Sequence, residues 1–198
     1  SLWPHLFSTV LPRYVYNTLV LMFGVGAMSL IFGISSAWVV TRYNFFGKKI
    51  FEWALLLPAA VPAYIIAYTY TDFLEYAGSF QKTLREIFNW NSSSDYWFPE
   101  IRSMSGAIVV MSCVLYPYVY MMTRASFLTV PISFYQTSLV YGRNSFFSVA
   151  LPLARPGIFA GLALVLMETI SDFGTVEYFA LETLTLGVFN VWLGMNSL

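Results

Sequence analysis

The sequence predicts an all-α integral membrane protein, a polytopic helical bundle with about four spanning helices and a partial fifth. Hydrophobic residues make up 58% of the chain and charged residues only 10%, and the mean hydropathy is +0.66. Apolar runs long enough to cross about 30 Å of hydrocarbon recur along the chain. Because a backbone in lipid must satisfy its own hydrogen bonds, these runs are expected to be helices.

The first predicted span is Tyr14–Thr41, which follows an interfacial lead-in over residues 1–13. Gly26, Gly33 and Ala37 place small side chains at helical spacing within it. In lipid, hydrophobicity alone does not drive helices together, so small residues that allow close approach are typical of helix contacts. We therefore expect these three positions to pack against neighbouring helices.

The second predicted span runs from about Ile50 to Tyr70 and contains Pro58 and Pro62. Two prolines four residues apart free backbone carbonyls and bend a helix. In a membrane such a bend is tolerated against other protein or a water-filled cavity. The pattern predicts one bent helix in the interior of the bundle.

Two further spans are predicted at Met104–Thr123 and Gly157–Glu177. The last stretch, Leu181–Leu198, is too short and too polar to cross and is predicted to be a half-helix or an external loop. We expect residues 1–198 to form one compact transmembrane domain that was cut from a longer polypeptide at both ends.

The distribution of charge predicts the orientation of the chain. Two loops carry basic residues and no Asp or Glu, whereas the segment 72–103 mixes both signs. By the positive-inside rule, the basic loops face the cytoplasm and 72–103 forms a periplasmic cap with a short amphipathic helix around Phe80–Phe88. The basic residues of the two loops are Arg42, Lys48 and Lys49, and Arg124, Arg143 and Arg155.

The composition argues against several classes of function. One cysteine, Cys113, allows no internal disulfide, and one histidine, His5, removes most zinc and acid–base sites. The net charge is zero, which argues against a nucleic-acid partner. No phosphate-binding Gly-Lys-Ser/Thr loop occurs, so ATP hydrolysis is expected on a separate subunit, and no cofactor is predicted.

A polar island at residues 124–156 separates the third and fourth predicted spans. We expect a short helix at Tyr135–Tyr141, a turn at Gly142, and then an apolar surface made by Phe146, Phe147 and Val149. A solvated loop does not need such a surface, so the pattern favours a docking site for a partner. An ordinary loop whose prolines start the next helix is the alternative.

This order of short helix, glycine, apolar cluster and Leu-Pro resembles the EAA loop of ATP-binding cassette importer permeases. In that family the loop forms the coupling helix seated on the ATPase subunit. The family's Glu-Ala-Ala is Gln136-Thr137-Ser138 here, and the segment after the glycine is about three residues, or nearly one helical turn, shorter than usual. The resemblance implies ATPase-coupling roles for Gln136, Thr137, Ser138, Gly142, Phe146, Phe147, Leu151 and Pro152.

Glu168, Asp172 and Glu177 form the most unusual polar cluster in the predicted spans. Glu168 and Asp172 are four residues apart and are expected to share a helix face. An ionised carboxylate facing lipid is costly, so these groups are predicted to line a water-filled translocation path. The alternative is that they lie at the outer interface, where they are solvated and structural.

Several stretches resemble the iron(III)-type permeases of binding-protein-dependent importers: Asp95–Glu100, Leu115–Tyr120, Met167–Thr169 and Asp172–Phe179. The resemblance implies that the chain is most of the N-terminal half of a fused permease in the bacterial inner membrane. It implies transport of ferric ion delivered by a periplasmic binding protein. It also implies cytoplasmic ATP-binding cassette ATPase subunits, a second permease half or subunit, and surrounding lipid as partners. No residue is assigned as an iron ligand.

Three other functions are compatible with the same sequence features. A related permease for another small ion or for thiamine would carry the same loop. A carboxylate-based intramembrane enzyme would use Glu168 and Asp172 as an acid–base pair. A structural membrane subunit would bury these carboxylates in paired, dry contacts.

Overall fold

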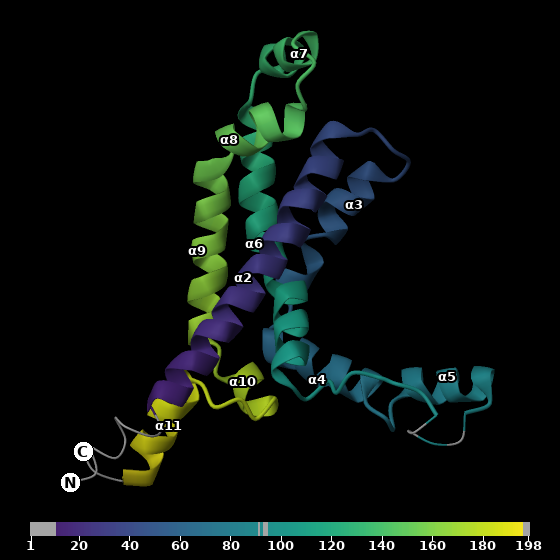
Figure 1. Cartoon of the computed structure of the whole chain (residues 1–198), viewed down its shortest axis with the longest axis vertical. Coiled ribbons are helices and arrows are strands. Elements are labelled where there is room, and N and C mark those ends of the chain that lie inside the picture. Colours follow the sequence, from purple (N-terminus) through teal and green to yellow (C-terminus); the bar gives the residue numbers. More distant parts are fainter. Residues whose placement is uncertain (1–10, 91, 93–94, 196–198) are drawn as a thin grey trace. The chain divides into compact units, whose positions relative to one another are not determined.

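The computed structural model describes residues 11–90, 92 and 95–195, with side chains in the last helix as far as Phe189. Every regular element in these residues is a helix (Figure 1). The contacts divide the chain into two compact units. The first unit comprises Ser1–Gly24, Val61–Met111 and Thr169–Leu198, and the second comprises Val25–Ala60 and Ser112–Glu168. The predicted lead-in lies mostly outside the described residues.

Within the described part of the chain, two helices are long and apolar enough to cross a membrane, α2 (Leu11–Arg42) and α6 (Met104–Thr129). They confirm the first and third predicted spans. α2 includes Pro12, because a proline in the first turn removes only an N–H that has no partner there. Two more segments reach the required length and hydropathy only as broken pairs of helices, which gives up to four candidate spans.

The second predicted span is not one bent helix, and that prediction was wrong. It consists of α3 (Lys48–Ala54), a 3₁₀ turn η2 (Leu57–Ala60) and α4 (Ala63–Leu74). Pro62, directly before α4, has an extended ψ of 137° and so does not continue a helix. A proline also disfavours helical geometry in the residue before it, which is Val61 here. The predicted interior position is also wrong for α3 and η2, since neither contains a buried residue.

The fourth predicted span ends earlier than expected. α9 covers Arg155–Ser171 and follows a π-helical turn η3 (Phe146–Ala150) and α8 (Leu151–Leu153), with a 60° bend between these turns and α9. Glu177 lies instead on a separate short helix, α10 (Gly174–Tyr178). The predicted half-helix is α11 (Leu184–Met195), although residues 196–198 lie outside the described residues.

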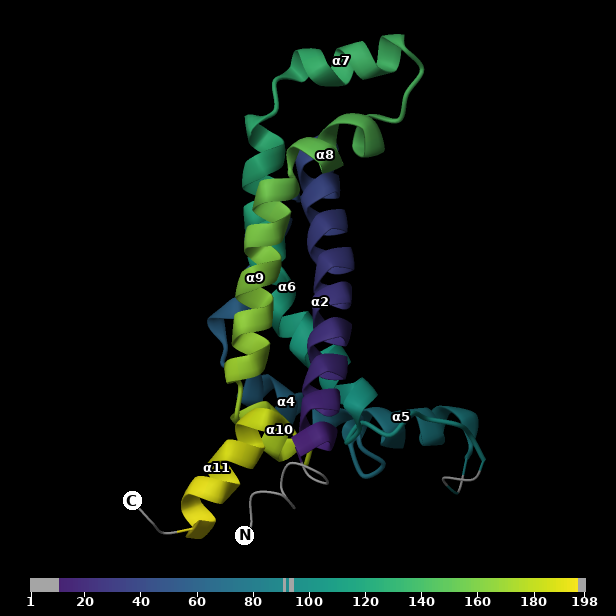
Figure 2. The same cartoon turned by 60° about the vertical axis from the view of Figure 1, so that its left-hand side comes forward.

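Close packing at Val119 joins three helices of the second unit. Val119 of α6 is fully buried, and α2, α6 and α9 lie side by side there (Figures 1 and 2). A Cβ added to Gly33 of α2 would lie 2.7 Å from Val119 Cβ, and one added to Gly161 of α9 would lie 2.7 Å from Val119 Cα. The expected contact roles of Gly33 and of the buried Ala37 are confirmed, and Gly26 packs against Leu162 and Leu166.

Trp38 of α2 organises an aromatic core at the loop end of the second unit. Its ring centroid lies 5.7 Å from Phe127, 6.3 Å from Tyr135 and 5.0 Å from Phe146. These partners belong to α6, to the loop helix α7 (Ile132–Val140) and to η3. The island between the third and fourth spans is therefore packed onto the helices and is not a free loop.

The first unit joins distant parts of the chain by hydrogen bonds. The Asn17 side chain donates to the carbonyl of Glu182 at 3.0 Å, and the Leu184 amide donates to Thr18 Oγ1 at 3.0 Å. α10 packs against α4, where the rings of Tyr68 and Tyr178 are 5.8 Å apart. The predicted amphipathic helix around Phe80–Phe88 is confirmed as α5 (Ser79–Phe88).

Replacing Gly161 by alanine should destabilise the second unit, because the new Cβ meets the backbone of α6 and the helices must separate. We expect a loss of about 1–3 kcal/mol, as for other overpacked cores, measured as a lower unfolding temperature of the purified protein in detergent. Ala163→Val, on the exposed face of the same helix, is the control and should change little. Equal unfolding temperatures for Gly161→Ala and the unmodified protein would contradict the packing.

Candidate functional site

The first candidate site is the island 124–156, whose centre is α7. In both views of the fold α7 lies beyond the ends of α2 and α9 within the second unit (Figures 1 and 2). The chain leaves α7 at Tyr141 and turns at Gly142, which has φ +63°. No atom lies within 4 Å of a Cβ added to Gly142, so the backbone angle and not the space requires glycine. The predicted turn is confirmed.

The inner face of α7 packs on the protein and its outer face is exposed. Tyr135 and Ser138 are buried, and the hydroxyls of Ser138 and Ser145 are 2.6 Å apart. Burial raises the pKa of the Tyr135 phenol, and the nearby Arg42 partly offsets this effect. Gln136 and Thr137 are exposed, so the structure separates the predicted tripeptide into two outer residues and the inner Ser138.

The apolar residues after the turn do not form one exposed surface. Phe146 is half-buried and contacts Trp38, and Val149 is buried in the same core. The expectation of an exposed Phe146–Phe147–Val149 cluster is therefore wrong for two of its members, because the π-helical turn directs them onto α2. Phe147 remains 66% exposed. Leu151 packs against the core and Pro152 is half-buried in α8.

A larger exposed apolar group lies on α7 itself, and the sequence reasoning missed it. Val140 is 84% exposed and Tyr141 75%. The signal was present in the sequence: once Tyr135 and Ser138 are taken as the inner face, helical spacing places Val140 opposite them. The other exposed apolar side chains of this segment are Ile132, Phe134 and Leu139.

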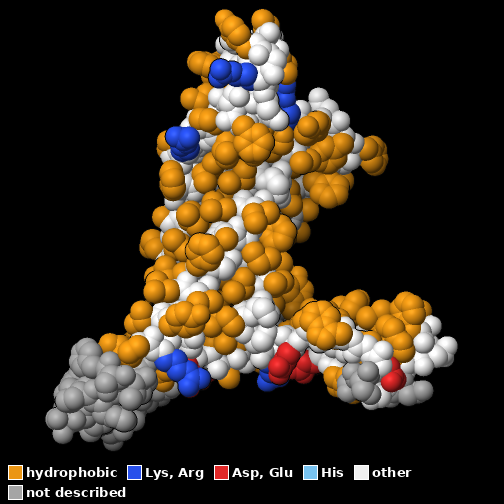
Figure 3. Space-filling view, viewed as in Figure 1, with side chains coloured by type: hydrophobic (Ala, Val, Ile, Leu, Met, Phe, Trp, Pro, Cys, Tyr) orange, Lys and Arg blue, Asp and Glu red, His pale blue; other side chains and the backbone are white. Residues whose placement is uncertain are grey.

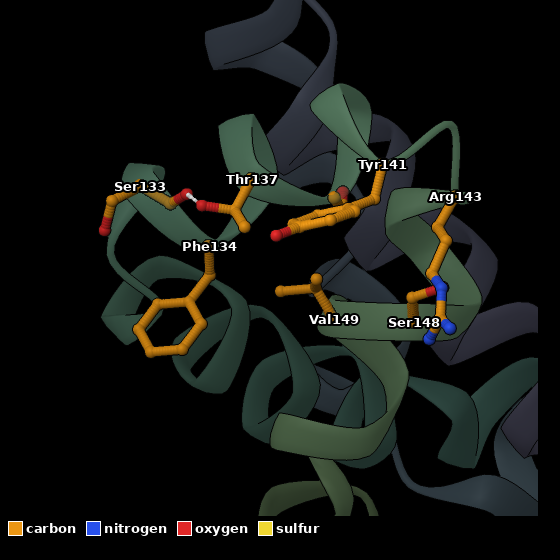
Figure 4. A pocket seen from close by; sticks show the side chains of 8 residues that line it. Ser133, Phe134, Thr137, Tyr141, Arg143, Ser148 and Val149 are labelled. Atoms are coloured by element: carbon orange, nitrogen blue, oxygen red, sulfur yellow. Dashed lines mark hydrogen bonds between the residues drawn. The ribbon is translucent and has the colours of Figure 1, made fainter.

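A hollow of about 560 Å³ lies beside α7 (Figure 4). Figure 4 shows Thr137 and Tyr141 on one side of it and Val149 and Ser148 on the other, with Arg143 at its edge. Hydroxyl groups and one guanidinium line it, and no carboxylate does. The lining residues are Ser133, Phe134, Thr137, Ser138, Tyr141, Arg143, Ser148 and Val149.

The second candidate site is the carboxylate segment, where the structure corrects the sequence reasoning. α9 ends at Ser171, so Asp172 lies beyond the helix and does not share a helix face with Glu168. Asp172 instead accepts hydrogen bonds from the Thr175 amide at 2.9 Å and the Thr175 hydroxyl at 2.6 Å. An Asp that can bond a following amide favours such a cap over a continuing helix. Glu168 is exposed on α9.

Glu177 lies at a second hollow, of about 520 Å³, within the first unit. Its lining combines one carboxylate with three phenols and contains no Lys or Arg: Tyr64, Ile65, Tyr68, Gly174, Glu177 and Tyr178. Among the described residues no group of three or more His, Cys, Asp or Glu side chains could hold a metal ion. The hollow is therefore a mainly apolar, aromatic surface that carries a few oxygen atoms, and not a preformed metal centre.

A cation lies next to this hollow but is already paired. Arg102 Nε is 2.5 Å from Glu75 Oε1, and Arg102 Nη2 is 3.4 Å from the Tyr178 hydroxyl. The hydrogen bond and the charge of Glu75 raise the pKa of the Arg102 guanidinium. Both charges are partly exposed, so the pair fixes the position of Arg102 more than it adds stability.

Comparison with known proteins identifies relatives among transport proteins. The chain is 30% identical over 154 residues to the molybdenum transport system permease protein ModB of Haemophilus influenzae, covering 76% of this chain and 64% of the relative. It is 27% identical over 189 residues to the Fe(3+)-transport system permease protein FbpB 2 of the same organism, covering 93% of this chain and 32% of the relative. The sulfate transport system permease protein CysT of Escherichia coli is 24% identical over 171 residues, covering 82% of this chain and 57% of the relative.

The chain thus spans less than two thirds of the length of these relatives. All three are named as transport permease proteins and none as an enzyme. Residues 3–190 match the family described as the binding-protein-dependent transport system inner membrane component. With its apolar helices and this match over nearly its whole length, the chain belongs to the family of binding-protein-dependent transport system inner membrane components.

Proposed function

We propose that the chain is a permease subunit of an ATP-driven importer in the bacterial inner membrane. A periplasmic binding protein would deliver the substrate, and cytoplasmic ATP-binding cassette ATPase subunits would drive transport with a second permease half or subunit. The family match and the transport relatives support this proposal. The two all-basic loops support a cytoplasmic position for α7, and the mixed charges of 72–103 support a periplasmic one for that segment.

The observation that carries the ATPase contact is the two-sided packing of α7. Its inner face is fixed to Trp38 through Tyr135, so a force on α7 is transmitted to α2. Its outer face exposes Val140 and Gln136 with nothing of the described chain covering them. Tyrosine, exposed next to Val140 as Tyr141, is among the residues that contribute most at protein interfaces, and covering Val140 would remove further apolar surface from water.

The substitution Val140→Asp should release the ATPase subunit, because it would bury an unpaired charge in the contact. A cost on the order of 2 kcal/mol corresponds to about 30-fold weaker binding. The measurement is the amount of ATPase subunit that co-purifies with the permease. Val140→Thr keeps the shape without the charge and is the control.

Co-purification that is unchanged by Val140→Asp would contradict the contact. Phe146→Ala distinguishes loss of the ATPase contact from loss of packing inside the permease. Since Phe146 packs on Trp38, this variant should lower the unfolding temperature of the permease itself, whereas Val140→Asp should not.

For the substrate we propose ferric iron, and the Glu177 hollow carries this choice. Its lining offers carboxylate and phenol oxygens without a cation, and hard oxygen ligands suit a hard cation. In this proposal Glu168, Asp172 and Glu177 belong to the translocation path in different ways. Glu168 and Glu177 are exposed, whereas Asp172 is a positioning residue that caps the helix carrying Glu177.

A tetrahedral oxyanion is the second candidate, because the molybdenum and sulfate relatives are similar to this chain. Arg102 is the cation that an oxyanion would use near the Glu177 hollow, where it already contacts the Tyr178 hydroxyl. It would first have to exchange Glu75 for the substrate. The ferric proposal is preferred because this pairing leaves no excess positive charge beside the hollow.

Uptake measurements on the assembled transporter separate the two substrates. With ferric iron as substrate, Glu177→Gln should lower uptake of radioactive iron roughly 10-fold, the effect of about 1.4 kcal/mol, while Arg102→Gln has a smaller effect. With an oxyanion as substrate, Arg102→Gln should abolish molybdate or sulfate uptake and Glu177→Gln should leave it intact. Uptake of an oxyanion and not of iron would overturn the ferric proposal.

The role of Asp172 is tested by two substitutions at one position. Asp172→Asn keeps an acceptor for the Thr175 amide, so it should retain the cap and leave the unfolding temperature nearly unchanged. Asp172→Ala removes both hydrogen bonds and should destabilise the α10 region by about 1 kcal/mol, the usual effect of losing a helix cap. If Asp172→Asn reduces iron uptake as much as Asp172→Ala does, and does so without lowering the unfolding temperature, the negative charge of Asp172 itself acts in transport.

A further inference from the structure

The amphipathic helix α5 is attached to the first unit by its polar side. Gln81 is buried and donates to the Leu74 carbonyl at 2.7 Å, while it accepts from the Tyr96 hydroxyl. Arg85, one turn further, donates to the same hydroxyl at 3.0 Å and to the Tyr76 carbonyl at 2.9 Å. Its guanidinium also lies over the Tyr76 ring. This polar inner side reverses the usual order, in which an amphipathic helix packs by its apolar face.

The apolar side of α5 is therefore turned outward. Phe80, Leu84, Ile87 and Phe88 recur at the spacing of one helix face. Ile87 is 64% exposed and Phe88 is 56% exposed. This face is made of large aliphatic and aromatic side chains and contains no charge.

A third side of α5 carries charged and polar groups that are also exposed: Lys82, Thr83 and Glu86. The helix thus has one side for protein, one apolar side and one side suited to water. A helix that lies at a membrane surface needs these three sides, because protein, hydrocarbon and water meet along its length. The continuity of the apolar side with the neighbouring membrane segments is what favours lipid over a partner protein on this side.

The apolar face continues onto the neighbouring membrane segments. The Phe80 ring is 5.7 Å from Phe73 of α4 and 6.2 Å from Phe98. Trp97, which precedes Phe98 in the sequence, is 85% exposed. The candidate span α6 starts a few residues later at Met104. Figure 3 shows hydrophobic side chains gathered along the arm that carries α4 and α5 (labelled in Figure 1).

We propose that α5 is an interfacial helix that lies in the headgroup region of the lipid bilayer, with Ile87 and Phe88 directed into the lipid. Three observations carry it: the inverted packing of Gln81 and Arg85, the exposed uncharged face, and its continuity with α4 and the start of α6. Phenylalanine and other large apolar side chains on the face opposite the charged side are typical of such an anchor. The segment 72–103 is thereby held at a fixed depth by lipid as well as by its links to the first unit.

Site-directed spin labelling tests this contact in the full-length transporter, reconstituted in vesicles of phosphatidylethanolamine and phosphatidylglycerol. Native cysteines, including Cys113, are replaced by alanine, and a single cysteine is introduced at Ile87 or, as the matched control, at Glu86. The two positions are adjacent in sequence but lie on different sides of α5. The measurements are collision rates of the label with molecular oxygen, which concentrates in lipid, and with a water-soluble nickel chelate.

The lipid contact predicts a severalfold higher ratio of oxygen to nickel collisions at position 87 than at position 86. Labels placed in turn at 82, 84 and 88 should make this ratio vary with the period of a helix. A high nickel collision rate at 87 would show that this face is in water. Low rates with both probes at 87 would show that a protein covers it. Either result would overturn the proposal without affecting the ATPase contact or the choice of substrate.

Discussion

The second unit depends on the close approach of α2 and α9 to α6 at Val119. Helices in lipid gain little from hydrophobic burial, because the surrounding chains are as apolar as their own side chains. Gly33 and Gly161 remove the side chains that would hold the three backbones apart, and Val119 fills the space between them. Once the backbones are this close, dispersion contacts along the helices stabilise the bundle, and the elements at its end have a fixed base.

The island between α6 and α9 takes its form from this base. Trp38 provides an aromatic surface that holds Tyr135 of α7 and Phe146 of η3. These contacts use the inner side chains of the island and leave Val140 and Phe147 exposed. The island is therefore rigidly connected to α2 and still presents an uncovered surface. The proposed ATPase contact requires both properties.

The first unit is held together by polar groups in places where the sequence would suggest solvated side chains. Asp172 caps α10 and so positions Glu177 beside Tyr64 and Tyr178. Gln81 and Arg85 fix α5 through carbonyls and the Tyr96 hydroxyl. In both cases the polar side chains serve the internal structure, and the neighbouring carboxylate of Glu177 or the apolar face of α5 is left exposed.

The sequence by itself determined the class of the protein, the two long spans, the short helices α5 and α7, the turn at Gly142 and the contact role of Gly33. These features depend on local rules: hydropathy over a window, helical periodicity and backbone preference. Only the tertiary structure decided that Phe146 and Val149 are core residues, that Asp172 leaves the helix of Glu168, and that the span containing Pro58 and Pro62 is broken. The burial of Phe146 and Val149 depends on the partners that these side chains find across the fold. Asp172 and Pro62 act on neighbouring residues instead, and the sequence pattern is compatible both with a helix that continues past them and with one that ends there. Composition and spacing do not specify the partners of Phe146 and Val149, because an apolar residue satisfies the same pattern whether it contacts Trp38, lipid or another protein.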